Sequence, residues 1–141
     1  MAKVASLLLA LFGLAACERQ SPLENSAAIK VAYELQERCG ETARKWFAGD
    51  LKSYDSKKNI INHSNHYNAK LNKCFGVLSV VALKGDKRSF FLEDLLENKS
   101  VGAYIGTERP DKMEVDLCTV GEKQCKSERE WADLTKPYMN D

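Results

Sequence analysis

Residues 73–83 read Lys73-Cys74-Phe75-Gly76-Val77-Leu78-Ser79-Val80-Val81-Ala82-Leu83, and this stretch decides the fold. It is an almost continuous run of apolar residues, which is typical of a central strand or one buried on both faces. The next residues, Lys84-Gly85-Asp86-Lys87, are a turn signal, and Arg88–Leu92 returns to strand-forming residues. The sequence therefore predicts an antiparallel hairpin.

The segment before this hairpin predicts a helix over Ser26–Phe47. Its apolar residues recur at three- and four-residue steps, as one face of an α-helix requires; they are Ile29, Ala32, Tyr33, Leu35, Ala43, Trp46 and Phe47. Charged residues fill the opposite face. Asn25 or Ser26 is expected to cap the N-terminus of this helix, and Gly49 is expected to end it.

Further strands and a second helix complete the expected domain. The strands are predicted at Ile60–Lys70, Val101–Gly106 and Met113–Cys118. Ser127–Tyr138 predicts a short helix, in which Ser127 and Glu130 fit a capping box and Pro137 is expected to fray or stop the last turn. The order of elements predicts an α+β fold of two layers, with an N-terminal helix packed on a small antiparallel sheet and a short C-terminal helix.

Residues 1–16 predict a secretory signal peptide. A short start that contains Lys3 is followed by an uncharged, leucine-rich run over Val4–Ala16. This run is shorter than the roughly 20 apolar residues that a helix needs to cross a bilayer. We therefore expect residues 1–16 to be removed after export.

The end of this segment, Leu14-Ala15-Ala16-Cys17, resembles the lipobox of bacterial lipoproteins. The resemblance covers residues 1–18 and implies cleavage before Cys17, a diacylglycerol on its sulfur and usually a further acyl chain, such as palmitate, on its amine. Several chains anchor a protein stably, whereas one chain binds a membrane only marginally. In the sorting rule of this family, an Asp directly after the lipidated cysteine implies retention in the inner membrane. This chain has Glu18 at that position, so the resemblance favours the outer membrane. The alternative is an ordinary signal peptide in which Cys17 is incidental.

This interpretation divides the chain into three parts. Residues 1–16 are the signal peptide, residues 17–25 are the lipidated cysteine with a polar tether, and residues 26–141 are a single globular α+β domain. The 125 residues that remain after removal of residues 1–16 are enough for one domain of ordinary size.

The four remaining cysteines predict two disulfide bonds. Exported proteins retain disulfides, and four cysteines allow three pairings that sequence alone does not separate. We favour Cys39–Cys74, which would join the first helix to the central strand, and Cys118–Cys125, which has Gly121 between its cysteines as a tight loop requires. The chain contains no Cys-x-x-Cys pair, so its cysteines do not match a thioredoxin-like or zinc-ribbon pattern.

Charge argues against a nucleic-acid partner. Residues 1–16 contain one charged side chain, Lys3, so residues 17–141 carry 20 Lys and Arg against 20 Asp and Glu. These charges are mixed along the chain, whereas nucleic-acid-binding domains usually carry a basic patch or stripe. Beyond the lipid on Cys17, we expect no electrostatic attachment to a membrane surface.

We find no catalytic or metal motif. The two histidines, His63 and His66, would share a face only if the segment were helical, and in a strand they would point to opposite faces. No Gly-x-Ser-x-Gly elbow is present, and the neighbouring carboxylates Glu93 and Asp94 are expected to be solvated. We therefore expect no enzyme activity, no metal and no cofactor.

The most distinctive part of the mature chain is His66-Tyr67-Asn68 followed by Lys70–Phe75. With Cys125–Glu128 and Lys136–Met139, it faintly resembles small exported bacterial proteins of unknown role, which implies a disulfide-bearing envelope domain and no particular activity. Tyr67, Asn68 and Asn72 are candidates for a recognition surface. The alternative is that the asparagines cap turns and that Tyr67 packs.

The sequence therefore predicts a membrane-anchored, periplasm-facing lipoprotein that acts as a protein-binding or accessory module of the cell envelope. We expect the lipid on Cys17 to attach it to a membrane, and we expect its protein partner to be another protein of the envelope. Two other functions are kept as alternatives: an inhibitor of a wall-degrading enzyme such as lysozyme, and a cryptic hydrolase.

Overall fold

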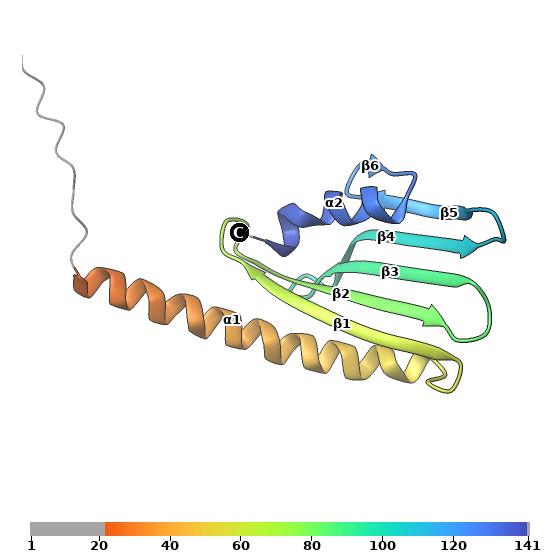
Figure 1. The fold of residues 1–141 in the computed structure, drawn as a ribbon. Helices are drawn as coiled ribbons and strands as arrows, with labels where there is room; N and C mark the ends of the chain where they lie inside the picture. The colour runs from red at the N-terminus through yellow and green to blue at the C-terminus, as the bar shows by residue number, and fades with distance from the viewer. Residues whose placement is uncertain (1–21, 141) are drawn as a thin grey trace, which may run out of the picture.

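The computed structural model describes the backbone of residues 22–140 and the side chains of residues 26–140. Figure 1 shows this part of the chain as a sheet with a long helix, α1, along one side and a short helix, α2, on the other. The predicted signal peptide, residues 1–16, and the predicted lipidation site, Cys17, lie outside the described residues.

The elements follow one another as helix, sheet and helix, as the sequence predicted. The helices and the 3-10 turn are α1 (Pro22–Asp50), η1 (Leu51–Ser53) and α2 (Glu128–Met139). The strands are β1 (Asn59–Asn68), β2 (Lys73–Ala82), β3 (Lys87–Asp94), β4 (Lys99–Glu108), β5 (Met113–Val120) and β6 (Lys123–Gln124). The α+β fold class is confirmed.

The sheet is an antiparallel meander in which each strand pairs with the next, in the order β1-β2-β3-β4-β5-β6. The central hairpin predicted from residues 73–92 is its β2–β3 pair. β1 pairs with β2 in continuous register from Asn59↔Ala82 to Asn68↔Lys73. The residues of β2 are buried or half-buried along its whole length, as its apolar composition predicted.

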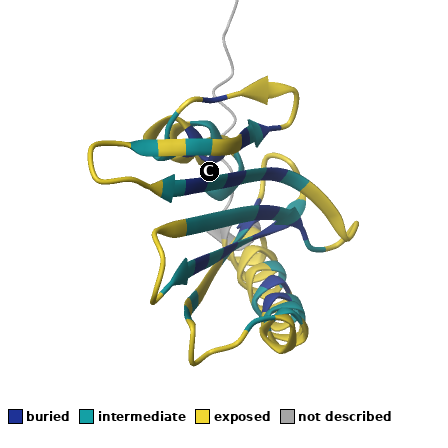
Figure 2. Ribbon diagram, turned by 90° about the vertical axis from the view of Figure 1, so that its right-hand side faces the viewer, coloured by how far each residue is buried: buried dark blue, intermediate teal, exposed yellow. Residues whose placement is uncertain are grey.

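The two helices cover opposite faces of the sheet. Cys74 and Phe75 are neighbours in β2, so their side chains point to opposite faces. Cys74 is bonded to Cys39 of α1, whereas the Phe75 ring lies 5.2 Å from the ring of Tyr138 in α2. The layers are therefore helix, sheet and helix, and the expectation of two layers is wrong. Figure 2 shows that the buried residues concentrate in the strands and on one side of α1.

Helix α1 is longer than predicted at both ends. It begins at Pro22, so neither Asn25 nor Ser26 caps it, and it continues through Gly49 to Asp50 before η1. Proline suits the first turn of a helix because its fixed φ is helical and its missing N–H needs no partner there. Residues 22–25, predicted as tether, are therefore the first turn of the helix.

Helix α2 begins as predicted but passes its proline. Ser127 is its N-cap, and the Ser127 hydroxyl accepts a hydrogen bond of 3.1 Å from the amide of Glu130. The Glu130 carboxylate in turn accepts a 2.8 Å bond from the amide of Lys126, one residue earlier than the ideal capping box. Pro137 lies inside the last turn, and the helix ends only at Met139.

Both favoured disulfides are confirmed, and each belongs to a hydrophobic cluster. Cys39–Cys74 lies with Tyr67 between α1 and the sheet. Cys118–Cys125 belongs to the larger cluster on the α2 face, which Phe75, Leu92, Tyr104, Val120 and Trp131 complete. The second cluster contains stacked aromatic rings, with Phe90 5.5 Å from Trp131 and 5.6 Å from Tyr104.

Candidate functional site

The turn between β1 and β2, residues 69–72, is fastened to the end of α2 by one side chain. Asn68 is fully buried, and its Nδ2 donates to the carbonyl oxygens of Pro137 (2.9 Å), Tyr138 (3.2 Å) and Asn140 (3.1 Å). Its Oδ1 accepts a 2.9 Å bond from the amide of Leu71. Asn68 therefore supplies donors to carbonyls that a helix end leaves without partners.

Tyr67 also forms hydrogen bonds within the molecule. Its hydroxyl donates a 2.6 Å hydrogen bond to Oδ1 of Asn72, and its amide donates a 3.1 Å bond to Oε1 of Gln36 in α1. The Tyr67 ring is buried against the Cys39–Cys74 bridge. Asn72 has a φ of +51°, a left-handed conformation that asparagine tolerates better than most residues.

The three residues predicted as a recognition surface are therefore brought together, but two of them face inward. The exposed part of this turn consists of Ala69, Lys70, Leu71 and Asn72. The sequence could not distinguish these roles, because the carbonyls that Asn68 satisfies lie about 70 residues further along the chain, as in its bond to Tyr138. Two clefts flank the turn, one on each face of the sheet.

The first cleft, which we call the helix notch, lies where α1 leaves the sheet. It has a volume of about 320 Å³, and its lining residues are Ile29, Ala32, Tyr33, Gln36, Tyr67 and Ala69. Figure 1 shows the N-terminal part of α1 projecting beyond the ends of the strands. Residues 26–34 of this helix are all exposed, with Ile29 49% and Tyr33 71% accessible.

The exposed part of α1 continues the stripe by which the helix packs on the sheet. Residues at three- and four-residue steps share one side of a helix. Leu35, Cys39, Ala43 and Trp46 follow these steps against the sheet, and Ala28 and Ala32 extend the same series past its edge. The helix thus carries a packing surface that the described residues leave uncovered.

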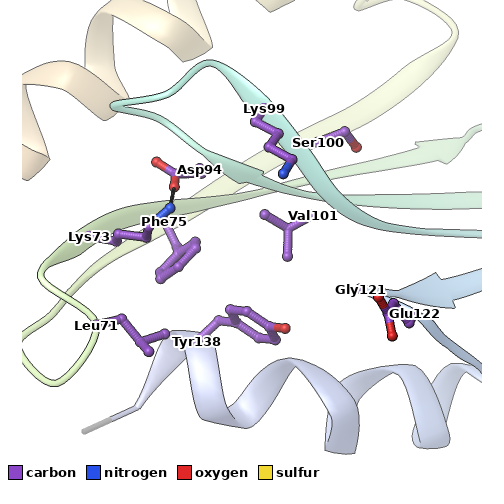
Figure 3. Close-up of a pocket in the computed structure, with 10 residues that line it drawn as sticks. All are labelled: Leu71, Lys73, Phe75, Asp94, Lys99, Ser100, Val101, Gly121, Glu122 and Tyr138. Carbon is purple, nitrogen blue, oxygen red and sulfur yellow. Dashed lines mark hydrogen bonds and ion pairs between the residues drawn. The ribbon is translucent and has the colours of Figure 1, made fainter.

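The second cleft, which we call the α2 cleft, has a volume of about 480 Å³ and lies between α2 and one end of the sheet. Its lining residues are Leu71, Lys73, Phe75, Asp94, Lys99, Ser100, Val101, Gly121, Glu122 and Tyr138. Figure 3 shows Phe75, Val101 and Tyr138 around its centre, with Lys73 and Asp94 to one side and Lys99 and Glu122 at other edges. This combination of an apolar centre and a few polar groups is typical of ligand sites.

One ion-pair network stabilises a wall of the α2 cleft. The Lys73 ammonium lies 2.6 Å from Oδ2 of Asp94 and 2.7 Å from the carboxylate of Glu97. Asp94 is 2% exposed, and its Oδ1 accepts 3.1 Å bonds from the amides of Leu96 and Glu97. Burial alone would raise the pKa of Asp94, but these hydrogen bonds and the Lys73 charge bring its pKa below the ordinary value. Asp94 is therefore a buried, paired carboxylate, contrary to the expectation that it is solvated.

Two charged groups of the α2 cleft have no such partner. Within residues 26–140, neither the Lys99 ammonium nor the Glu122 carboxylate forms an ion pair or a side-chain hydrogen bond. These residues come from β4 and from the β5–β6 turn, so no contiguous motif joins them. The sequence placed Leu71, Lys73 and Phe75 in its most distinctive segment and Tyr138 in Lys136–Met139, but it assigned none of them to a cleft.

The histidines lie in β1, where residues three apart point to opposite faces. The His63 ring stacks on Phe47 of α1 with the ring centroids 3.9 Å apart. Among the described residues, no group of three His, Cys, Asp or Glu side chains is placed to hold a metal ion.

Comparisons with protein-family models, with curated proteins and with solved structures find no match to this chain. Within residues 22–140, no helix combines the length and the apolar character that crossing a membrane requires. Proposals about function therefore depend on the sequence and on the geometry of the two clefts.

Proposed function

We propose that this chain is a membrane-anchored lipoprotein of the cell envelope, without enzyme activity, that binds another protein through the helix notch. The observation that carries this proposal is the exposed apolar surface of α1 at the helix notch, where Ile29 is 49% and Tyr33 71% exposed. Exposed apolar patches beside polar residues commonly mark protein-interaction sites. A helix face of this kind matches the helix-in-groove mode of recognition.

The cysteines support the proposed location in the cell envelope. Leu14-Ala15-Ala16-Cys17 resembles a lipobox, and two disulfides among the other cysteines suit an oxidising compartment such as the periplasm. Glu18 favours the outer membrane in the sorting pattern of that family. With lipid on Cys17, α1 would begin five residues from the anchor, and its projecting half would lie between the membrane and the sheet.

The charges around the projecting half favour a protein over a lipid surface. Helices that lie on membranes carry a face rich in Lys and Arg, which is attracted to anionic lipids. Residues 26–37 contain one cation, Lys30, and two anions, Glu34 and Glu37. An acidic or neutral helix of this kind has no electrostatic attraction to a membrane, so we assign its apolar stripe to a protein partner.

Site-specific photocrosslinking in living cells tests the proposed binding. The photoreactive residue p-benzoylphenylalanine replaces Tyr33 in the full chain, and a matched control carries it at Lys45, an exposed position of α1 outside the helix notch. We expect one recurrent envelope protein to be captured from position 33 and not from position 45. The same background from both positions, or capture of lipid alone from position 33, would contradict the proposal.

The anchor has its own test. Cys17→Ser removes the sulfur that the diacylglycerol requires, so we expect the intact mass to lose the lipid and the protein to leave the membrane fraction. Lipid still attached to the Cys17→Ser chain would refute the proposal that Cys17 carries the anchor. If the partner captured from position 33 were a wall-degrading enzyme that the purified chain inhibits, the inhibitor alternative would be established.

A further inference from the structure

The α2 cleft is distinct from the helix notch and lies on the opposite face of the sheet. Its centre is formed by Phe75 and Tyr138, whose rings meet edge to face with centroids 5.2 Å apart, together with the half-buried Val101. Leu71, 46% exposed at the tip of the β1–β2 turn, closes one side. The centre of this cleft is therefore suited to an apolar group of a ligand.

Of the two lysines in the cleft, only one is available to a ligand. Lys73 is held by Asp94 and Glu97, as its 2.6 Å and 2.7 Å distances show. Lys99 forms no ion pair among the described residues, and Figure 3 shows its ammonium above the apolar centre of the cleft. One unpaired cation beside an apolar surface is complementary to an apolar molecule that carries a single carboxylate.

The Glu122 carboxylate further restricts the class of ligand that the cleft can bind. The Glu122 carboxylate, also without a partner among residues 26–140, can accept hydrogen bonds but cannot donate them. It would repel a multiply charged anion such as a phosphate ester, and it favours a ligand that has an N–H donor. A peptide end combines these features, because it has a terminal carboxylate, an apolar last side chain and backbone N–H groups.

We propose that the α2 cleft binds the C-terminal end of a polypeptide whose last residue is apolar. The Lys99 ammonium binds the terminal carboxylate, the surface of Phe75, Val101 and Tyr138 holds the last side chain, and Glu122 accepts a backbone N–H of the peptide. Capture of terminal carboxylates is an established mode of peptide recognition. This site does not depend on the partner of the helix notch.

A peptide titration tests this proposal. The probe is acetyl-Gly-Ala-Ala-Leu with a free carboxylate, added to the oxidised, ¹⁵N-labelled full chain in detergent, with the amide signals of Gly121 and Val101 followed by NMR. The comparison peptide has the same sequence with a C-terminal amide. We expect the free acid to bind about ten-fold more tightly, because an ionic hydrogen bond to Lys99 is lost in the amide.

Two pairs of variants make the test specific. Lys99→Ala should remove the preference for the free acid, whereas Lys84→Ala, at an exposed lysine outside the cleft, should retain it. Leu71→Asp should weaken binding of both peptides, whereas Leu96→Asp, at another exposed leucine in the β3–β4 turn and outside the cleft, should not. All four positions are on the surface, so each variant should keep the wild-type NMR spectrum elsewhere.

Three results would overturn the proposal. They are equal binding of acid and amide, a preference for the acid that survives Lys99→Ala, and no binding at millimolar peptide. Decanoate is tested in parallel as an apolar carboxylate without N–H groups. Binding of decanoate with no binding of the peptide would show a site for acyl chains and would also overturn the assignment to a polypeptide end.

Discussion

The two helices are held by the sheet in different ways, although each packs on one of its faces. α2 has 12 residues, and its buried Trp131 belongs to the larger cluster, on which Leu134 and Tyr138 also pack. α1 has 29 residues, but among residues 26–50 its buried positions are confined to the part around the Cys39–Cys74 bridge. The difference teaches that α2 is as long as packing requires, whereas α1 contains turns that folding of this domain does not need.

Removal of the tryptophan of each helix should reveal this difference most strongly. Trp131→Ala leaves a cavity among stacked rings, so we expect a loss of about 3–5 kcal/mol in the free energy of unfolding measured with urea. Trp46 of α1 is only half-buried, so Trp46→Ala should cost less than about 3 kcal/mol. Equal losses from the two variants would show that α1 and α2 are held equally well.

The disulfides should differ in the same experiment. The Cys39→Ala/Cys74→Ala double variant opens a loop of 35 residues and should cost about 3–4 kcal/mol on the chain-entropy model. Cys118→Ala/Cys125→Ala opens a loop of 7 residues and should cost about 2–3 kcal/mol. Hydrogen exchange should then show α1 opening first in the former variant. If α1 stays protected there, its attachment does not depend on the bridge.

Asn68 tests whether the β1–β2 turn serves α2 or a partner. Asn68→Ala removes the side-chain donor from three carbonyls at the end of α2, and we expect a loss of about 2 kcal/mol with faster exchange there. Asn62→Ala, at an exposed position of the same strand, should change stability by less than about 0.5 kcal/mol. Unchanged stability in Asn68→Ala would return this residue to the candidate recognition surface.

Acid should lower the stability of the fold by protonating Asp94 on the α2 face. Its folded pKa lies below its unfolded value of about 3.9, so the carboxylate stabilises the fold above that value. This contribution is lost as the pH falls below about 4 and through the folded pKa. In Asp94→Asn, stability measured by urea unfolding should depend less on pH in this range, whereas Asp111→Asn, at an exposed aspartate, should match the wild type. Parallel curves for all three proteins would exclude Asp94 as the cause.

The smallest effect on stability is expected from the projecting half of α1. The double variant Ile29→Ser/Tyr33→Ser changes exposed side chains, so the free energy of unfolding should fall by less than about 0.5 kcal/mol. Crosslinking to the partner from a neighbouring position such as Glu34 should nevertheless be lost. A loss of stability above about 1 kcal/mol would mean that this half of α1 belongs to the core, and the contrast between the helices would not hold.

The sequence predicted best what is encoded locally. The apolar run at Cys74–Ala82 and the following turn signal predicted the β2–β3 hairpin, and the positions of Cys39 and Cys74 on a helix and a strand predicted their bridge. These predictions succeeded because period, turn residues and spacing are properties of short segments. Burial of β2 on both faces also required a cover on each side, which only the placement of α2 opposite α1 provides.

Features that depend on distant partners were not predictable in this way. Pro137 is expected to end a helix, but the carbonyls near it accept hydrogen bonds from Asn68, which belongs to β1, about 70 residues earlier in the sequence. Lys73, Asp94 and Lys99 line one cleft only because β2 begins, β3 ends and β4 begins at the same end of the sheet. Asp94 was expected in solvent, since its sequence neighbours do not reveal the ammonium that pairs with it.

The order of the disulfides along the chain has a consequence for how the protein matures. In a chain that crosses a membrane N-terminus first, Cys39 emerges before the other disulfide cysteines, and the next of them to appear is its native partner, Cys74. Cys118 then meets Cys125 seven residues later. Since each strand also pairs with the one just before it, the sheet can grow in the order of emergence. Vectorial oxidation would therefore form the native bridges directly, without a disulfide isomerase to rearrange them.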